Sequence, residues 1–154
     1  MKALILTSAL AIVTASSALA DGFVCKNEDL AVKVYNNIEP RIGTRAVAVM
    51  VISDRTVAYG RKTIARFTDL NGRISQKGAS YLADVDLRYS DSSRKGELIG
   101  GTKLGELHTI QLDVDFSYAR PVPAGEFVGG TLTLNKRNGD TITLDLECER
   151  YLKN

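Results

Sequence analysis

Apolar and polar residues alternate along much of the chain, which is the pattern of β-strands with one buried and one exposed face. The stretch YLADVDLRYS places five side chains on a common face: Tyr81, Ala83, Val85, Leu87 and Tyr89. The stretch TIQLDVDFSY does the same with Ile110, Leu112, Val114, Phe116 and Tyr118. We therefore expect both stretches to form half-buried strands.

The stretch TLTLNKRNGDTITLDLEC predicts a β-hairpin. Asn138 and Gly139 are typical of a two-residue turn in which both central residues adopt positive φ. Its arms present one apolar set, namely Leu132, Leu134, Ile142, Leu144, Leu146 and Cys148.

Two earlier stretches alternate less cleanly. TRAVAVMVISD is apolar on both faces, which predicts a strand that runs through the middle of the core. EDLAVKVYNNI fits a strand through Leu30, Val32 and Val34, and it also fits a short helix. Its Val and Tyr content favours the strand.

Short turn-forming segments separate these stretches, and no linker or repeat divides the chain. The pattern predicts an all-β single domain of about eight antiparallel strands with little or no helix. An up-and-down barrel is the favoured architecture, because closure removes exposed strand edges. A two-sheet β-sandwich is the alternative.

The first residues have the three parts of a secretory signal peptide. Lys2 supplies the positive charge, an apolar run extends from Ala3 to Val13, and small residues stand at Ala18 and Ala20. We expect residues 1–20 to be a signal peptide that is cleaved after Ala20, which leaves residues 21–154 as one secreted or periplasmic domain. We expect no transmembrane segment, because no apolar run approaches the roughly 20 residues that span a bilayer.

An outer-membrane barrel would carry the same alternation with its faces reversed. Against it, the chain has no Trp and ends in Lys153-Asn154 rather than in an aromatic residue. We therefore expect an interior that is apolar.

The two cysteines lie at opposite ends of the predicted domain. Cys25 begins the first predicted strand and Cys148 ends the last one. Paired cysteines are expected in an oxidising compartment, so we predict a Cys25–Cys148 disulfide that joins the first and last strands. This disulfide would stabilise the folded state by about 4–5 kcal/mol, because it closes a long loop and so restricts the unfolded chain.

Charge is nearly balanced overall but not along the chain. Residues 21–80 carry a net charge of +4 and residues 81–154 carry −3. A candidate partner-binding basic patch consists of Arg41, Arg45, Arg55, Arg61, Lys62 and Arg66. The patch would suit an anionic surface or polymer, although a solvated surface explains it as well. We expect an unknown protein or an anionic envelope polymer as partner, and no nucleic acid.

The chain offers few groups for catalysis. The sole histidine, His108, has neither a second histidine nor a free thiolate to form a zinc site or a nucleophilic pair. Carboxylates two residues apart share a face in three places: Asp84 and Asp86, Asp113 and Asp115, and Asp145 and Glu147. Such pairs bind calcium or hydrolyse glycosides in other settings, but each pair here alternates with apolar residues, as on the wet side of a sheet. We therefore expect no catalytic residue, metal or cofactor.

The tail CERYLKN, together with GTRAVAVMVISD and LDVDFSY, resembles small exported proteins of unknown function from predatory bacteria. The resemblance runs along most of the expected mature chain. It implies export and a bacterial source, and it carries no activity or site residue.

Three functions remain open at this point. The first is a non-catalytic binding module that contacts a protein or cell-envelope partner through its loops, with the basic segment and the loop Ser90–Gly96 as the first places to look. The second is a small-molecule carrier with a ligand inside the barrel, which requires an interior cavity. The third is a carbohydrate-active hydrolase that uses the paired aspartates.

Overall fold

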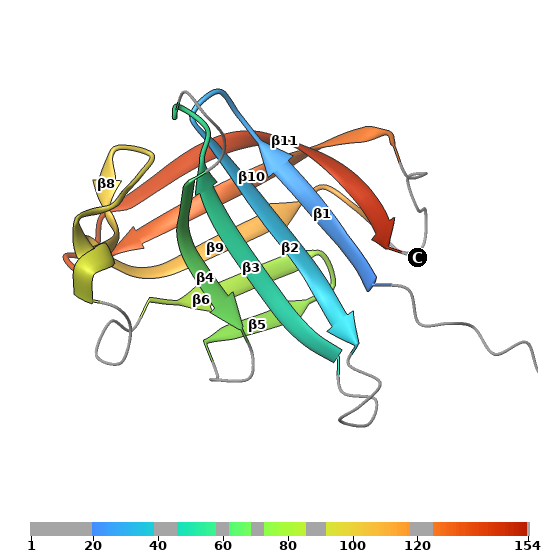
Figure 1. Ribbon diagram of the computed structural model, residues 1–154, viewed down its shortest axis with the longest axis horizontal. Helices are drawn as coiled ribbons and strands as arrows, with labels where there is room; N and C mark the ends of the chain where they lie inside the picture. Colours follow the sequence, from blue (N-terminus) through green and yellow to red (C-terminus); the bar gives the residue numbers. More distant parts are fainter. Residues whose placement is uncertain are drawn as a thin grey trace, which may run out of the picture.

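A single antiparallel sheet curls into a nearly closed barrel in the computed structural model (Figure 1). The structure describes residues 20–38, 46–57, 62–68, 73–85, 92–117 and 125–153. Within these residues the sheet has nine strands: β1 (Ala20–Lys26), β2 (Leu30–Ile38), β3 (Ala46–Asp54), β4 (Lys62–Thr68), β5 (Ile74–Lys77), β6 (Ser80–Asp84), β9 (Leu107–Val114), β10 (Phe127–Lys136) and β11 (Thr141–Lys153).

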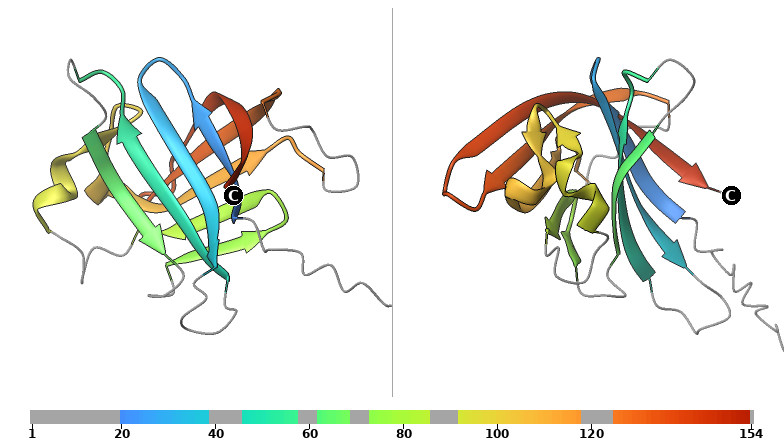
Figure 2. Two further views of the ribbon diagram at one scale, coloured as in Figure 1. Left: turned by 45° about the vertical axis from the view of Figure 1, so that its right-hand side comes forward. Right: turned by 60° about the vertical axis from the view of Figure 1, so that its left-hand side comes forward.

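The strands follow one another round the barrel in chain order, as an up-and-down topology requires. Their order in the sheet is β4-β3-β2-β1-β11-β10-β9-β6-β5, so the first and last strands are neighbours. The break in the sheet lies between β4 and β5, which are its two terminal strands (Figure 2). The predicted barrel with paired first and last strands is confirmed.

Inward-facing side chains form one continuous cluster. The predicted alternation holds in β6, where Tyr81 and Ala83 are buried, and in β9, where Ile110 and Leu112 are fully buried. EDLAVKVYNNI forms strand β2 rather than a helix. The predicted face residues Leu87, Tyr89 and Tyr118 lie outside the described residues.

Strand β3 is buried on both faces at its centre, as its sequence predicts. Val49, Met50 and Ile52 are each at most 2% exposed, although Val49 and Met50 point to opposite sides of the sheet. On its outer side Val49 lies between Tyr35 of β2 and Thr68 of β4, its register partners on the two neighbouring strands.

The β10–β11 hairpin is present, with a turn one residue longer than predicted. The Lys136 amide donates to the Asp140 carbonyl oxygen (2.8 Å), and the Gly139 amide donates to the Lys136 carbonyl oxygen (3.1 Å). Three residues therefore lie between Lys136 and Asp140, and Gly139 has φ +95°. A three-residue turn with glycine in the left-handed region is the next most common hairpin connection after the two-residue turn.

A small substructure covers one end of the barrel. It consists of the 3₁₀ turn η2 (Ser92–Gly96), a two-stranded ribbon of β7 (Leu98–Ile99) and β8 (Thr102–Lys103), and the 3₁₀ turn η3 (Leu104–Glu106). Ile99 and Leu104 belong to the same buried cluster as the barrel side chains. The substructure therefore closes this end of the core (Figures 1 and 2).

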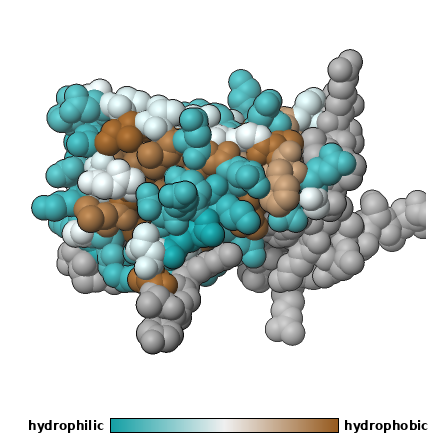
Figure 3. All heavy atoms as spheres, turned by 90° about the horizontal axis from the view of Figure 1, so that it is seen from above, coloured by the Kyte–Doolittle hydropathy of each residue, from teal (hydrophilic) through white to brown (hydrophobic). Residues whose placement is uncertain are grey.

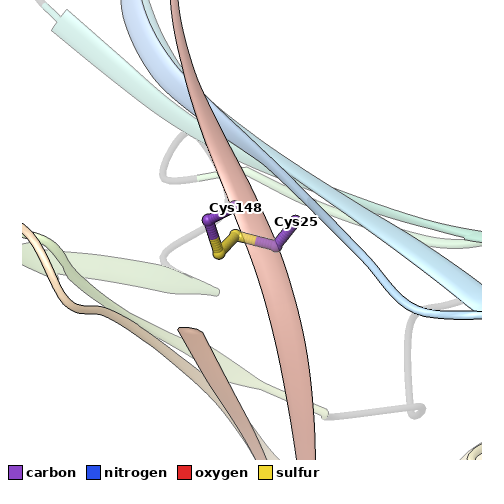
Figure 4. The surroundings of a disulfide bond; sticks show 2 residues. All are labelled: Cys25 and Cys148. Carbon is purple, nitrogen blue, oxygen red and sulfur yellow. A yellow bond between two sulfur atoms is a disulfide. The ribbon is translucent and has the colours of Figure 1, made fainter. Parts of the chain in front are cut away.

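The predicted disulfide joins Cys25 and Cys148 (Figure 4). The two residues are directly opposite in the β1–β11 register, with their Cα atoms 3.9 Å apart. Both are fully buried, so the bridge lies inside the barrel. It fixes the closure between the first and last strands and leaves the β4–β5 break unbridged.

Candidate functional site

Two segments that the sequence marks as candidate partner sites meet at the free edge of β4. The guanidinium of Arg94, in η2, donates to the carbonyl oxygens of Thr63 (3.3 Å) and Ile64 (3.0 Å). Nearby, the ammonium of Lys62 lies 2.6 Å from the Glu97 carboxylate. We refer to β4 together with Arg94 and Glu97 as the β4 edge.

A β-bulge explains why two β4 carbonyls face Arg94. The β3–β4 register shifts between Ile52 and Ser53, so that Ala65 pairs with Ile52 while Thr63 pairs with Ser53. Ile64 is the extra residue, and its side chain is buried. Bulges bend a strand and leave part of its ladder unpaired. The guanidinium of Arg94 donates to these two carbonyl oxygens, as the backbone amides of a neighbouring strand would.

The η2 segment is held in place by backbone hydrogen bonds. The Glu97 amide donates to the Arg94 carbonyl oxygen (3.0 Å), and the Leu104 amide donates to the Glu97 carbonyl oxygen (2.8 Å). Ile99, two residues further on, is fully buried. The backbone of η2 is thus anchored to the end of the barrel, and the side chains of Arg94 and Glu97 reach from this segment to β4.

The structure describes three of the six residues of the predicted basic patch, namely Arg55, Lys62 and Arg66. Arg41, Arg45 and Arg61 lie outside the described residues. Arg55 is tied to the β1–β2 turn, where its guanidinium donates to the Asn27 carbonyl oxygen and its amide donates to the Asp29 carbonyl oxygen (2.8 Å). Lys62 and Arg66 are both on β4 and both exposed.

Basic side chains border both sides of the break in the sheet. Lys62 and Arg66 are exposed on β4, Lys77 is exposed on β5, and the half-buried Arg73 precedes β5. Neither of these two fully described strands contains an acidic residue. The break is therefore lined by positive charge.

Asp54, at the end of β3, is the one titratable group among the described residues whose pKa is clearly shifted. Its Oδ1 accepts hydrogen bonds from the Thr56 hydroxyl (2.6 Å) and from the Thr56 amide (2.7 Å). These bonds, with a smaller attraction from Lys62, hold the pKa of Asp54 below its ordinary value of 3.8. The carboxylate is a turn-forming group at the edge of the basic region.

Two of the three carboxylate pairs lie on the outer face of the barrel, one at the end of β9 and one on β11. Asp113 and Asp145 flank Thr131 in register, and the side-chain amide of Gln111 donates to both oxygens of Asp113 (3.1 and 2.9 Å). With Gly129 they border an open hollow of about 480 Å³. Asp115, Asp145 and Glu147 are exposed, Asp84 is exposed on β6, and Asp86 lies outside the described residues.

Other candidates for chemistry are dispersed. His108 is exposed on β9, and both cysteines are in the disulfide. Within the described part of the chain, no three His, Cys, Asp or Glu side chains are placed to hold a metal ion. None of the helices formed by these residues is long and apolar enough to cross a bilayer.

Large apolar side chains reach the surface singly. Among the described residues, Phe127 is 53% exposed and Leu98 is 55% exposed, and these two lie on different elements. Seen from above the view of Figure 1, hydrophobic surface is interrupted by hydrophilic side chains (Figure 3). Scattered apolar residues of this kind do not by themselves mark a binding surface.

The sequence marked the loop Ser90–Gly96 but not the contacts that Arg94 and Glu97 make. An arginine and a glutamate in a turn-rich segment carry no periodic signal, because their partners are about 30 residues away on another strand. Comparison with known proteins adds no further guide: no protein family, no curated protein and no solved structure matches this chain.

Proposed function

We propose that this protein is an exported, non-catalytic binding module that contacts a protein or cell-envelope partner through its loops and the β4 edge. The observation that carries the proposal is the meeting of η2 with β4, where Arg94 and Glu97 cover a strand edge bordered by basic side chains. Edges that lack a neighbouring strand are common sites of protein association.

The interior supports a binding module over a small-molecule carrier. Large side chains from six of the nine strands are fully buried there: Tyr81, Phe23, Leu30, Met50, Ile52, Ile110, Leu112, Leu132 and Leu134. The disulfide also projects into this space. A barrel of this size is usually filled by its own side chains unless it is shaped around one small ligand.

Export is supported by the signal-like N-terminal sequence and by the disulfide, which is consistent with an oxidising location. The non-catalytic assignment is supported by the outward placement of Asp113 and Asp145 and by the exposure of His108. A hydrolase would need two carboxylates in a cleft with unequal acidity.

The test is capture of envelope components by the immobilised, oxidised protein, repeated with two charge variants. Lys62→Glu/Arg66→Glu reverses the charge of the β4 edge. Lys33→Glu/Lys103→Glu makes the same change in net charge at exposed positions on β2 and β8. We expect one retained component that the β4 variant loses and the control variant keeps. Retention of nothing by the wild-type protein would contradict the proposal, and so would enzymatic turnover of an envelope polymer.

A further inference from the structure

We infer that the β4 edge binds an extended, acidic segment of a partner protein, which joins the sheet as an additional strand beside β4. This inference rests on the proposed binding function and specifies its mode and the chemistry of the partner.

The topology leaves β4 as a terminal strand. β1 and β11 pair along seven register positions and close the barrel on that side, whereas β3 is the one strand among the described residues that pairs with β4. At the end of β4 the Thr68 carbonyl oxygen accepts a hydrogen bond from the amide of Arg73, which precedes β5 (3.3 Å). A terminal strand presents a row of main-chain donors and acceptors that can pair with an added strand.

Arg94 occupies part of the position that an added strand would take. Its guanidinium satisfies the Thr63 and Ile64 carbonyl oxygens, which a neighbouring strand would satisfy with backbone amides. Because the η2 backbone is anchored elsewhere, this cover can leave β4 by a change in side-chain conformation alone. Arg94 therefore competes with an added strand for the same acceptors.

The second covering contact is exposed and readily exchanged. The Lys62 side chain is 53% exposed and the Glu97 side chain 28% exposed. An ion pair so open to solvent contributes little to stability, since water and salt screen it. A carboxylate from a partner can replace Glu97 on Lys62 at little cost.

Charge selects an acidic partner. Lys62, Arg66 and Lys77 are exposed along β4 and β5, and neither strand has an acidic residue. Acidic side chains at alternate positions of an added strand would lie on the same outer face as Arg66 and Lys77, whereas Lys62, which pairs with Asp54, is on the other face at the start of β4. Pairing of β4 with a second copy would instead bring like charges together across the new strand pair, which is unfavourable.

The probe is a short fluorescein-labelled peptide in which Glu and Val alternate, tested with the oxidised protein by fluorescence anisotropy. We expect saturable binding together with slower hydrogen exchange of the β4 amides. A peptide with Lys in place of Glu, and one with Pro at two central positions, test charge and strand geometry separately. Proline removes backbone donors and cannot continue a ladder.

Two pairs of variants locate the site. Lys62→Glu/Arg66→Glu should weaken binding roughly tenfold or more, while Lys33→Glu/Lys103→Glu leaves it within about twofold. Arg94→Ala should tighten binding roughly tenfold relative to Lys95→Ala, which removes the same charge from the same turn. Far-ultraviolet circular dichroism establishes that each variant is folded.

The inference is overturned if the Glu peptide does not bind, or if the Lys or Pro peptide binds equally well. It is also overturned if the Lys62→Glu/Arg66→Glu variant binds the Glu peptide as tightly as wild type, or if the protein self-associates in place of binding the peptide. If an envelope component is captured equally by wild type and β4 variant, the protein is still a binding module but the β4 edge is not its site. If nothing is captured and no peptide binds, both proposals fail.

Discussion

Gly130 lies so close to Cys148 that a β-carbon on the glycine would be 2.3 Å from the cysteine Sγ. The same β-carbon would lie 3.6 Å from Sγ of Cys25. Gly130 is on β10, next to β11, and its missing side chain provides the space that the disulfide occupies inside the barrel. The glycine and the bridge are therefore parts of one packing arrangement.

Gly130→Ala should destabilise the protein by about 1–3 kcal/mol, because a sulfur atom held in a disulfide cannot move aside as the end of a flexible side chain would. The matched control is Gly129→Ala, whose β-carbon would meet no atom within 4 Å. The free energy of unfolding in urea is the measurement. In a Cys25→Ala/Cys148→Ala background the cost of Gly130→Ala should largely disappear, and an unchanged cost there would contradict the packing argument.

Removal of the disulfide should lower the free energy of unfolding by about 4–5 kcal/mol, since the bridge links residues separated by 123 positions and restricts the unfolded chain. Cys25→Ala/Cys148→Ala should keep the barrel, because β1 and β11 remain paired along their backbones. Urea unfolding and far-ultraviolet circular dichroism test the two statements.

The oxidised state itself is checked by thiol titration under denaturing, non-reducing conditions. We expect no free sulfhydryl, as both cysteines are bridged. Two free thiols per chain would refute the bridge.

The β7–β8 ribbon turns through Gly100 and Gly101, which have φ +55° and +79°. Alanine at either position should cost about 1–2 kcal/mol, because a β-carbon disfavours the left-handed region. Gly100→Ala should cost more than Gly101→Ala, since its β-carbon would lie 2.6 Å from Leu144 Cδ1 whereas that of residue 101 meets nothing within 4 Å. Thermal unfolding of the two variants measures the difference, and equal costs would show that Leu144 yields freely.

The barrel could be predicted from the sequence because its strands bury one face, and period-two alternation records that burial directly. The pairing of β1 with β11 was predicted from Cys25 and Cys148, since a disulfide brings its two residues within a few ångströms and a closed barrel places its first and last strands side by side. The positions of the two cysteines, one near each end of the expected domain, were enough for this prediction. No comparable link marks β4 and β5, so the place where the sheet remains open could not be predicted.

The sequence predicted the basic residues of the β4 edge but not the contacts that they and Arg94 make. The run of basic residues ending at Arg66 was evident, but not the different contacts of its described members: Arg55 is bound to the β1–β2 turn while Lys62 contacts Glu97. The contact of Arg94 with Ile64 depends on a β-bulge, and a bulge leaves no periodic signature in KTIARFT. Which backbone carbonyl a side chain meets depends on the path of the chain, and the order of polar and apolar residues does not reveal it.

Asp54 offers a test of the electrostatics beside the β4 edge. Its pKa is lowered chiefly by the Thr56 hydroxyl, then by the Thr56 amide, and least by Lys62. Thr56→Val should raise the pKa of Asp54 part of the way toward 3.8, because the amide hydrogen bond remains. Lys62→Met should raise it less, and Thr63→Val, at an exposed β4 position, should leave it unchanged.

The lowered pKa of Asp54 determines how its contribution to stability depends on pH. A carboxyl group whose pKa is lower in the folded state stabilises the fold above the unfolded value of 3.8, and this contribution is lost as pH falls through the folded value. Thr56→Val should therefore make stability less sensitive to acid below pH 3.8. Carboxyl-carbon NMR titration of Asp54 in the three variants is the measurement. A larger rise of its pKa in Lys62→Met than in Thr56→Val would mean that charge, and not the hydrogen-bonded turn, controls this carboxylate.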